Sequence, residues 1–255
     1  MTQKKDSADN EAVIAALKRA EKMRIDFVAN VSHELRTPLT SIKGYTETLI
    51  EDLEQGRPAD PEFLNIILKN SNRLLSLIND LLDLSAIESG ADHLHPILID
   101  LKEFSGTVLD ALQHNAEKKN TEITLDVKTP QLIADPKRTE QVMVNLVENA
   151  IKYCPNGSMI RVSWEEFTSD AGREILLKVS DNGPGIPEKH LDRLFERFYR
   201  IDKGRSREMG GTGLGLSIVK HILQRHHGSI EVESTLGQGT TFICRFPNPR
   251  TLTKT

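Results

Sequence analysis

Apolar residues recur at helical spacing over most of the first 90 positions, and no other feature constrains the fold of this chain as strongly. Between residues 11 and 53 they follow at three- and four-residue steps, and the first convincing break is the turn at Gly56 and Pro58. After this turn comes a heptad row that the polar Asn70 interrupts: Phe63, Ile67, Leu74, Leu77, Leu81 and Leu84. Neither helix can bury such a row alone, so we expect an antiparallel helical hairpin.

The second helix is predicted to begin at Pro61, with Asp60 as its N-cap, and to end near residue 89. Its apolar face is wider than a two-helix contact needs, because Ile66, Ile78 and Leu82 lie outside the row. Pairing with a second copy of the chain into a dimeric four-helix bundle would bury this surplus, with Asn70 setting the register. The alternative is a monomeric hairpin packed on the next domain. Residues 1–10 are polar, and we expect them to be frayed.

One histidine of the first helix falls beside its apolar stripe, in the run Ser32-His33-Glu34. The expected stripe consists of Phe27, Val31, Leu35, Leu39 and Ile42. We therefore expect His33 to face solvent with a carboxylate beside it. Pro38 removes the backbone hydrogen bond to the carbonyl of Glu34 and should bend or loosen the helix just past the histidine. A lone histidine here is more often an ordinary surface residue, so the rest of the chain must decide.

The overall composition narrows the class of protein. The chain has 255 residues, of which 38% are hydrophobic and 27% charged, which is typical of a globular protein. Its formal net charge of -4 gives no reason to expect a nucleic-acid partner. No apolar run has the length of a membrane span, and no signal-peptide pattern opens the chain. Cys154 and Cys244 lack metal-type spacing, so free thiols in a reducing compartment are expected.

From His95 the periodicity changes to that of a mixed α/β domain. Strands are expected at 97–101, 123–127, 131–134, 159–167, 174–180, 229–234 and 239–246, with a turn at 170–172. Helices are expected around 104–116, after the Asp135-Pro136 cap, briefly after residue 183, and at about 213–227. This order predicts a mixed sheet covered by helices in two layers, followed by a loose tail after Phe246.

The helix after Pro136 carries polar residues on one face. Asn145, Asn149 and Lys152 stand at positions i, i+4 and i+7. Asparagine carbonyls are hard oxygen ligands suited to Mg²⁺, and a lysine adds a point charge for phosphate. A solvated helix face explains the same pattern equally well.

Two glycine-rich segments strengthen the nucleotide interpretation. Residues 181–187 follow a strand directly, and their glycines would let the backbone approach a flat ligand while Asp181 accepts an exocyclic amine. Residues 210–216 run from a loop into a helix, whose N-terminus and amides can cradle phosphate. This is neither a Walker loop nor a dinucleotide loop, since no Gly-Lys-Ser/Thr ends it and no strand precedes it. The polar, basic segment 201–209 could act as a lid.

With these segments in this order, the chain resembles the cytoplasmic core of sensor histidine kinases of two-component systems. It is most similar to the phosphate-regulon-sensor-like group. The likeness covers about residues 20–246, without a departure at a functional position. Its blocks are the H box at 27–40, the N box at 145–153, the first G box at 181–186, the F box at 195–200, the second G box at 211–216 and a last glycine motif at 237–242.

The resemblance implies an α+β protein with a signal-input helix at 1–24 and a dimerisation and histidine phosphotransfer domain at 25–90. A catalytic ATP-binding domain at 91–248 would follow, of the ATPase type shared with gyrase, a heat-shock chaperone and a mismatch-repair protein, with a tail at 249–255. The implied function is autophosphorylation of a homodimer from ATP and Mg²⁺, and transfer of the phosphoryl group to an aspartate in a response regulator receiver domain. Dephosphorylation of that regulator is also expected.

The resemblance also assigns roles to residues. His33 would accept the phosphoryl group, Glu34 would hold the other ring N–H, and Thr37 would orient water for dephosphorylation. Asn149 would hold Mg²⁺, and Asp181 would read adenine. The other residues expected to bind ATP are Asn145, Lys152, Tyr153, Gly183, Gly185, Ile186, Phe198, Arg200, Gly211, Thr212, Gly213, Leu214, Gly215, Leu216 and Thr240.

Two other functions stay open at this point. The chain could be an ATPase of the same superfamily that works as a conformational clamp, or a dimeric scaffold with an inert nucleotide domain. We expect a cytoplasmic location, with membrane anchoring only through an N-terminal sensor region outside this sequence.

Overall fold

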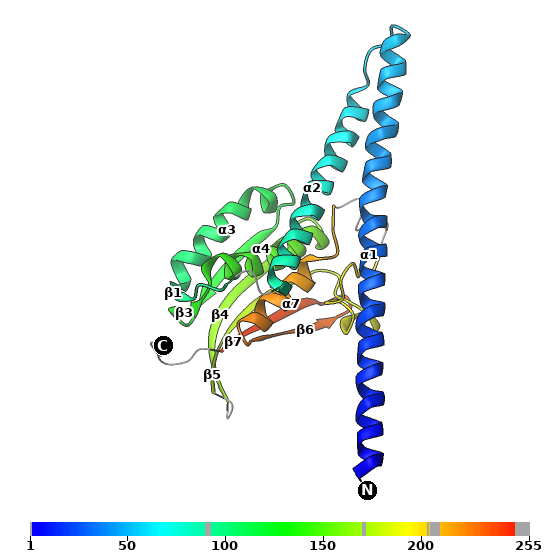
Figure 1. The fold of residues 1–255 in the computed structure, drawn as a ribbon. Helices are drawn as coiled ribbons and strands as arrows, with labels where there is room; N and C mark the ends of the chain where they lie inside the picture. The colour runs from blue at the N-terminus through cyan, green and yellow to red at the C-terminus, as the bar shows by residue number, and fades with distance from the viewer. Residues whose placement is uncertain (1, 90–92, 170–171, 203, 205–209, 248–255) are drawn as a thin grey trace. The chain divides into compact units, whose positions relative to one another are not determined.

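The structure is a computed structural model that describes residues 2–89, 93–169, 172–202, 204 and 210–247 (Figure 1). It divides into two compact units, Met1–Ile78 and Asn79–Thr255, which we call the hairpin unit and the sheet unit. Among the described residues, none of the helices combines the length and apolar character that a membrane crossing needs.

Two long helices confirm the predicted hairpin: α1 (Thr2–Glu54) and α2 (Pro61–Ser89). The expected N-cap is present, because the Asp60 carboxylate accepts a hydrogen bond from the backbone N–H of Glu62 (2.8 Å). The expected fraying of residues 1–10 is wrong, since α1 already begins at Thr2. This segment is polar but lacks Gly and Pro and contains good helix formers, so propensity favours the helix. Pro38 lies inside α1 without ending it.

The interior of the hairpin unit contains apolar and polar contacts. Leu49 and Leu77 are buried, and the rings of Tyr45 and Phe63 lie 5.1 Å apart. The Asn70 side chain donates to Ser41 Oγ (3.3 Å), so the polar residue of the heptad row joins the two helices of one chain.

The prediction is wrong for one member of the expected stripe, because Leu39 is 58% exposed while Pro38 is buried. Each four-residue step advances about 40° around a helix, so three such steps from Phe27 move Leu39 about 120° off the stripe.

A second apolar row lies on the outside of α2. Leu64, Leu68, Leu75 and Ile78 are each at least 40% exposed and follow heptad spacing. Of the three surplus residues expected from the sequence, Ile78 and Leu82 are exposed, whereas Ile66 is half-buried.

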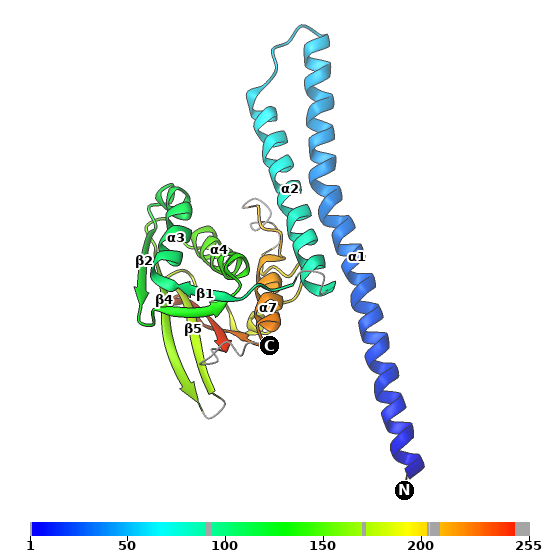
Figure 2. The same cartoon turned by 60° about the vertical axis from the view of Figure 1, so that its left-hand side comes forward.

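The sheet unit has the predicted two-layer architecture. Its five-stranded sheet has the order β2 (Glu122–Val127), β4 (Met159–Ser169), β5 (Gly172–Asp181), β7 (Gly239–Pro247) and β6 (Ser229–Thr235). Only the β2–β4 pair is parallel. One face is covered by α3 (Leu101–Glu117), α4 (Pro136–Tyr153) and α7 (Gly215–Arg225), as Figures 1 and 2 show. A two-stranded sheet of β1 (Ile97–Asp100) and β3 (Gln131–Ala134) and the short α5 (Glu188–Leu191) complete the described elements.

The core lies between the sheet and these helices. Trp164 is fully buried, and its indole N–H donates to Ser105 Oγ on α3 (2.8 Å). Phe246 packs 6.0 Å from it, ring centroid to ring centroid. A polar pair also fixes the start of α4, because His226 Nε2 accepts from the backbone N–H of Asp135 (3.1 Å). The expected cap is confirmed there, since the Asp135 carboxylate accepts from the N–H of Arg138 (3.0 Å).

The last turns of α2 belong to the sheet unit. Asp83 accepts hydrogen bonds from Arg138 (3.2 Å) and Gln141 (2.8 Å), both on α4. The Ile87 carbonyl accepts from Arg225 at the end of α7 (3.0 Å). The turn expected at 170–172 and the tail after residue 247 lie largely outside the described residues.

Candidate active site

The polar face of α4 meets the start of α7. Asn145, Asn149 and Lys152 are half-buried, whereas Leu146 on the opposite face is fully buried. A Cβ atom at Gly215 would lie only 2.8 Å from Asn145 Oδ1, so the absence of a side chain lets the N box and the second G box approach closely. The amide-bearing side chains and the first turn of α7 therefore border the same space.

The C-terminal end of α4 is held by a lysine that the sequence did not suggest. Lys119 Nζ donates to the carbonyls of Ile151 (2.7 Å), Lys152 (3.0 Å) and Cys154 (2.8 Å). A cation at the C-terminus of a helix satisfies its last carbonyls and complements its dipole. Lys119 fixes the turn that carries Lys152 and Tyr153. No local pattern could have revealed this, because its partners lie more than 30 positions away.

Asp181 ends β5 beside the end of α4. Its Oδ1 accepts from the backbone N–H of Gly183 (2.8 Å), which orients the half-buried carboxylate. Burial, followed by the charge of Asp181, raises the pKa of the Cys154 thiol to about 12. This thiol is therefore a protonated packing group at the base of the site rather than a nucleophile.

The loop after Asp181 is joined to the end of the sheet. Ile186 N–H donates to Ser234 Oγ on β6 (2.8 Å), and that hydroxyl lies 2.9 Å from Thr240 Oγ1 on β7. Thr240 also faces Asp181 in the β5–β7 register. The first G box and Thr240 are thus parts of one hydrogen-bonded edge.

The F box and the second G box fold against each other. The N–H of Phe198, a residue with φ of 62°, donates to the Gly213 carbonyl (2.8 Å). Arg200 donates to the Thr212 carbonyl (2.6 Å). Gly213 has φ of 76°, and a Cβ there would approach Phe198 Cα to 2.9 Å, so only glycine fits. This loop leads into the N-terminus of α7, where the described residues provide no side-chain hydrogen bond as a cap.

Charged groups gather beside this loop. Burial lowers the pKa of Lys152, with Glu148 acting in the opposite direction and Arg200 in the same direction. Burial raises the pKa of Asp80, whose carboxyl is hydrogen-bonded by Thr212. Two cationic side chains therefore stand near the helix N-terminus, where an anionic ligand is favoured.

The structure thus packs the predicted nucleotide-binding residues of the N box, the F box and the second G box against one another, and it places Asp181 and Gly183 beside Cys154 at the C-terminal end of α4. The half-buried ones are Asn145, Asn149, Lys152, Asp181, Gly185, Ile186, Phe198, Arg200, Thr212, Gly213, Gly215 and Leu216. Gly183, Gly211, Leu214 and Thr240 are buried, and Tyr153 is exposed. Leu214 is fully buried, so its side chain anchors the loop in the core. Most of the expected lid at 201–209 lies outside the described residues.

The histidine of the hairpin unit has the expected exposure. His33 and Thr37 are exposed, and Thr37 Oγ1 donates to the His33 carbonyl (3.2 Å). The Glu34 carboxylate accepts from Arg73 of α2 (2.7 Å). Arg73 did not emerge from the sequence, because it lies 39 positions from its partner.

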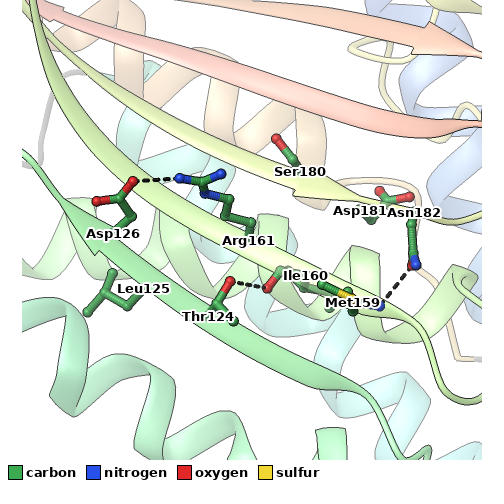
Figure 3. A pocket seen from close by; sticks show the side chains of 9 residues that line it. All are labelled: Thr124, Leu125, Asp126, Met159, Ile160, Arg161, Ser180, Asp181 and Asn182. Carbon is green, nitrogen blue, oxygen red and sulfur yellow. Dashed lines mark hydrogen bonds and ion pairs between the residues drawn. The ribbon is translucent and has the colours of Figure 1, made fainter.

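An open hollow of about 430 Å³ lies on the sheet unit (Figure 3). It is lined by Thr124, Leu125, Asp126, Met159, Ile160, Arg161, Ser180, Asp181 and Asn182. Figure 3 views the strands with the helices behind them, so the hollow faces away from the helical layer. It shares Asp181 with the candidate nucleotide site, but none of the N box or second G box residues lines it.

The polar residues of α4 also fit a magnesium ion of the kind that accompanies a nucleotide. Within the described part of the chain, no group of three or more His, Cys, Asp or Glu could hold a metal by itself. Mg²⁺ commonly takes one or two protein oxygens and completes its shell with water and phosphate. The half-buried amide of Asn149 is compatible with that mode.

Family models match parts of both units. The one described as histidine kinase-, DNA gyrase B-, and HSP90-like ATPase matches residues 134–250, and the His Kinase A (phospho-acceptor) domain matches residues 23–90. The sensor protein kinase WalK of Staphylococcus aureus is 38% identical over 231 residues, which are 90% of this chain and 55% of that protein. The chain spans 37% of the WalK of strain JH9, so it corresponds to about half or less of these relatives.

Solved structures of histidine kinases have the same fold. The histidine kinase AdeS of Acinetobacter baumannii has a TM-score of 0.70 at 28% identity, covering 86% of this chain and 98% of that one. The histidine kinase ThkA, solved in complex with the response regulator protein TrrA, has a TM-score of 0.70 at 26% identity. That match covers 91% of this chain and 64% of the other.

These relatives do not single out the phosphate-regulon-sensor-like group, which stays a prediction. They do agree on the order of a phosphoacceptor hairpin and an ATPase domain, and through both of these the chain belongs to the sensor histidine kinases of two-component systems.

Proposed function

We propose that this chain is the catalytic core of an ATP-dependent protein-histidine kinase. It transfers the γ-phosphoryl group of Mg-ATP to His33 and passes it to an aspartate of a response regulator. One observation carries the proposal: a chain with an exposed histidine on a helical hairpin also has its N box, F box and second G box packed against one another at the start of α7. The hairpin at 25–90 and the ATP-binding domain at 91–248 are the proposed functional limits.

The nucleotide is recognised at two ends of the site. The Asp181 carboxylate, oriented by the Gly183 N–H, accepts the exocyclic amine of adenine. Lys152 and the amides at the start of α7 bind the phosphates, because both offer positive charge to an anion. Mg²⁺ held by Asn149 would neutralise charge on the phosphate oxygens.

The reaction at His33 forms one bond and breaks another. A ring nitrogen of the neutral imidazole attacks the γ-phosphorus, an N–P bond forms, and the bond to the β-phosphate oxygen breaks to release ADP. Glu34 holds the N–H of the other ring nitrogen and stabilises the positive charge that develops on the ring. The step depends mostly on positioning the two reactants.

Two further parts of the proposal concern the hairpin unit. The exposed row of Leu64, Leu68, Leu75 and Ile78 supports a homodimer, because a second copy would bury it in a four-helix bundle. Thr37 lies one turn beyond His33, where its hydroxyl can orient water for dephosphorylation of the regulator. The structure of ThkA with a response regulator protein supports a partner of this class.

Incubation with γ-labelled ATP tests the function. We expect a label that survives alkali and is lost in acid, as a phosphohistidine is. His33→Gln should abolish it, whereas His114→Gln, a change at another exposed histidine, should keep it. Asp181→Asn should reduce labelling by weakening nucleotide binding.

Acid-labile label on the His33→Gln protein would overturn the assignment of the phosphoacceptor. ATP hydrolysis by the unchanged protein without any label would instead favour a conformational clamp. Purified receiver domains then test the second step, since a cognate one should remove the label rapidly.

A further inference from the structure

Arg73 and Glu34 form an ion pair that connects the two helices of the hairpin unit next to the phosphoacceptor. Arg73 Nη2 lies 2.7 Å from Glu34 Oε2. Only 10% of the arginine side chain and 12% of the glutamate side chain are exposed. Glu34 directly follows His33 in α1, so the guanidinium group of α2 holds the carboxylate nearest to the histidine in sequence.

The other ion pairs described in this unit differ in exposure. Lys43 and Glu47 are 74% and 60% exposed, and Arg57 is 53% exposed in its pair with Asp52. Surface pairs of this kind contribute little to stability. A nearly buried pair loses hydration on both partners, and an apolar pair of similar size would often stabilise the hairpin as well. The contribution of the ion pair to the stability of the hairpin therefore does not by itself explain why an arginine occupies position 73.

The geometry suits a role in orientation. A carboxylate has two oxygens that can each accept more than one hydrogen bond, so one carboxylate can bind an arginine and a second donor together. A free glutamate side chain samples many rotamers, and fixing it costs about 1.5–2 kcal/mol of conformational entropy. The arginine contact fixes the glutamate rotamer before the reaction, so that the carboxylate is already oriented when the imidazole develops charge.

We propose that Arg73 is a positioning residue for phosphoryl transfer to His33, acting through the carboxylate of Glu34. This inference rests on the proposed kinase function. It assigns to α2 an indirect part in the chemistry of a histidine on α1, and it predicts that Arg73 and Glu34 act as one unit.

Substitutions of both partners test the inference in the whole chain. Arg73→Gln should lower the labelling rate at saturating ATP about tenfold, a part of what a general base contributes, without changing KM for ATP. Arg73→Lys should recover part of the rate, because it keeps the charge but loses the planar fork. Arg57→Gln, which removes an exposed pair in the same hairpin, should label normally.

A double-mutant cycle separates action through Glu34 from independent action. In a Glu34→Gln background, Arg73→Gln should produce no further loss. A charge exchange, Glu34→Arg with Arg73→Glu, should restore the melting temperature but leave labelling slow. Circular dichroism and gel filtration on each variant establish that the hairpin is folded.

Three outcomes would overturn the inference: normal labelling by Arg73→Gln, an equal loss in both backgrounds, or full recovery of labelling by the charge exchange. The last result would show a purely structural pair. If His33→Gln still acquires acid-labile label, the proposed function itself fails. If His33 is required but Arg73→Gln labels normally, only this inference fails.

Discussion

Among single substitutions of partly exposed charged side chains in the sheet unit, we expect Lys119→Met to lower the free energy of unfolding most. Methionine keeps an unbranched apolar stem and removes only the ammonium group, whose three bonds to the end of α4 measure 2.7, 3.0 and 2.8 Å. A hydrogen bond to a charged group contributes about 1.5–3 kcal/mol, but these three share one half-buried cation. We therefore expect a total loss of about 2 kcal/mol in the free energy of unfolding.

For a unit of this size, about 2 kcal/mol corresponds to a fall of about 4–8 °C in Tm. Thermal and urea unfolding followed by circular dichroism measure the loss. Lys118→Met is the matched control, because the neighbouring side chain is exposed and only its backbone N–H takes part in the cap. KM for ATP should also rise, since the turn that carries Lys152 and Tyr153 loosens. Equal unfolding of the two variants would refute the capping role of Lys119.

Two further predictions concern the same unit. Burial lowers the pKa of His226 from its ordinary value of 6.5, so folding favours the neutral ring. Its stabilisation should be complete above about pH 6.5 and decline as the pH falls below that value, where the unfolded chain binds the proton more readily. His226→Gln should reduce this decline in urea titrations between pH 7.5 and 5. Asn149→Ala should remove Mg-ATP-dependent labelling while gel filtration still shows the same oligomer.

Each of these two changes has a control substitution at an exposed residue of the sheet unit. His114→Gln alters an exposed histidine of α3, and it should keep the pH dependence. An unchanged slope for His226→Gln would show that other groups carry the pH dependence. Glu140→Ala changes an exposed residue of α4 and should label normally. Normal labelling by Asn149→Ala would refute the proposed metal ligand.

Local patterns predicted much of this fold. The N-caps Asp60 and Asp135 were predictable because cap, proline and helix are adjacent in sequence. The limits of α2 and β3 followed from periodicity and turn residues in the same way. The expectation for Leu39 fails because a series of four-residue steps drifts around a helix, and the expectation for residues 1–10 fails because helix propensity outweighs their polar composition.

Contacts between residues far apart in the sequence limit how much of the candidate site can be predicted. From the sequence alone, the polar face of α4 is equally compatible with solvent, and the close approach of Asn145 to Gly215 distinguishes the two. Lys119 and Arg73 could not be found from spacing, since each resembles an ordinary surface cation until its partner, more than 30 positions away, is located. The strand order of the sheet was likewise not predicted, because no local pattern specifies which strands pair.

Trp164 gives the chain an internal optical probe of one unit. It is the single tryptophan of the sequence, it is fully buried in the sheet unit, and its indole bonds Ser105 on the covering helix α3. Intrinsic tryptophan emission therefore reports separation of α3 from the sheet and is silent about the hairpin unit. Circular dichroism, in contrast, also reports the long helices α1 and α2. Recording both signals in one denaturation would resolve whether the two units unfold together or in sequence, without any label.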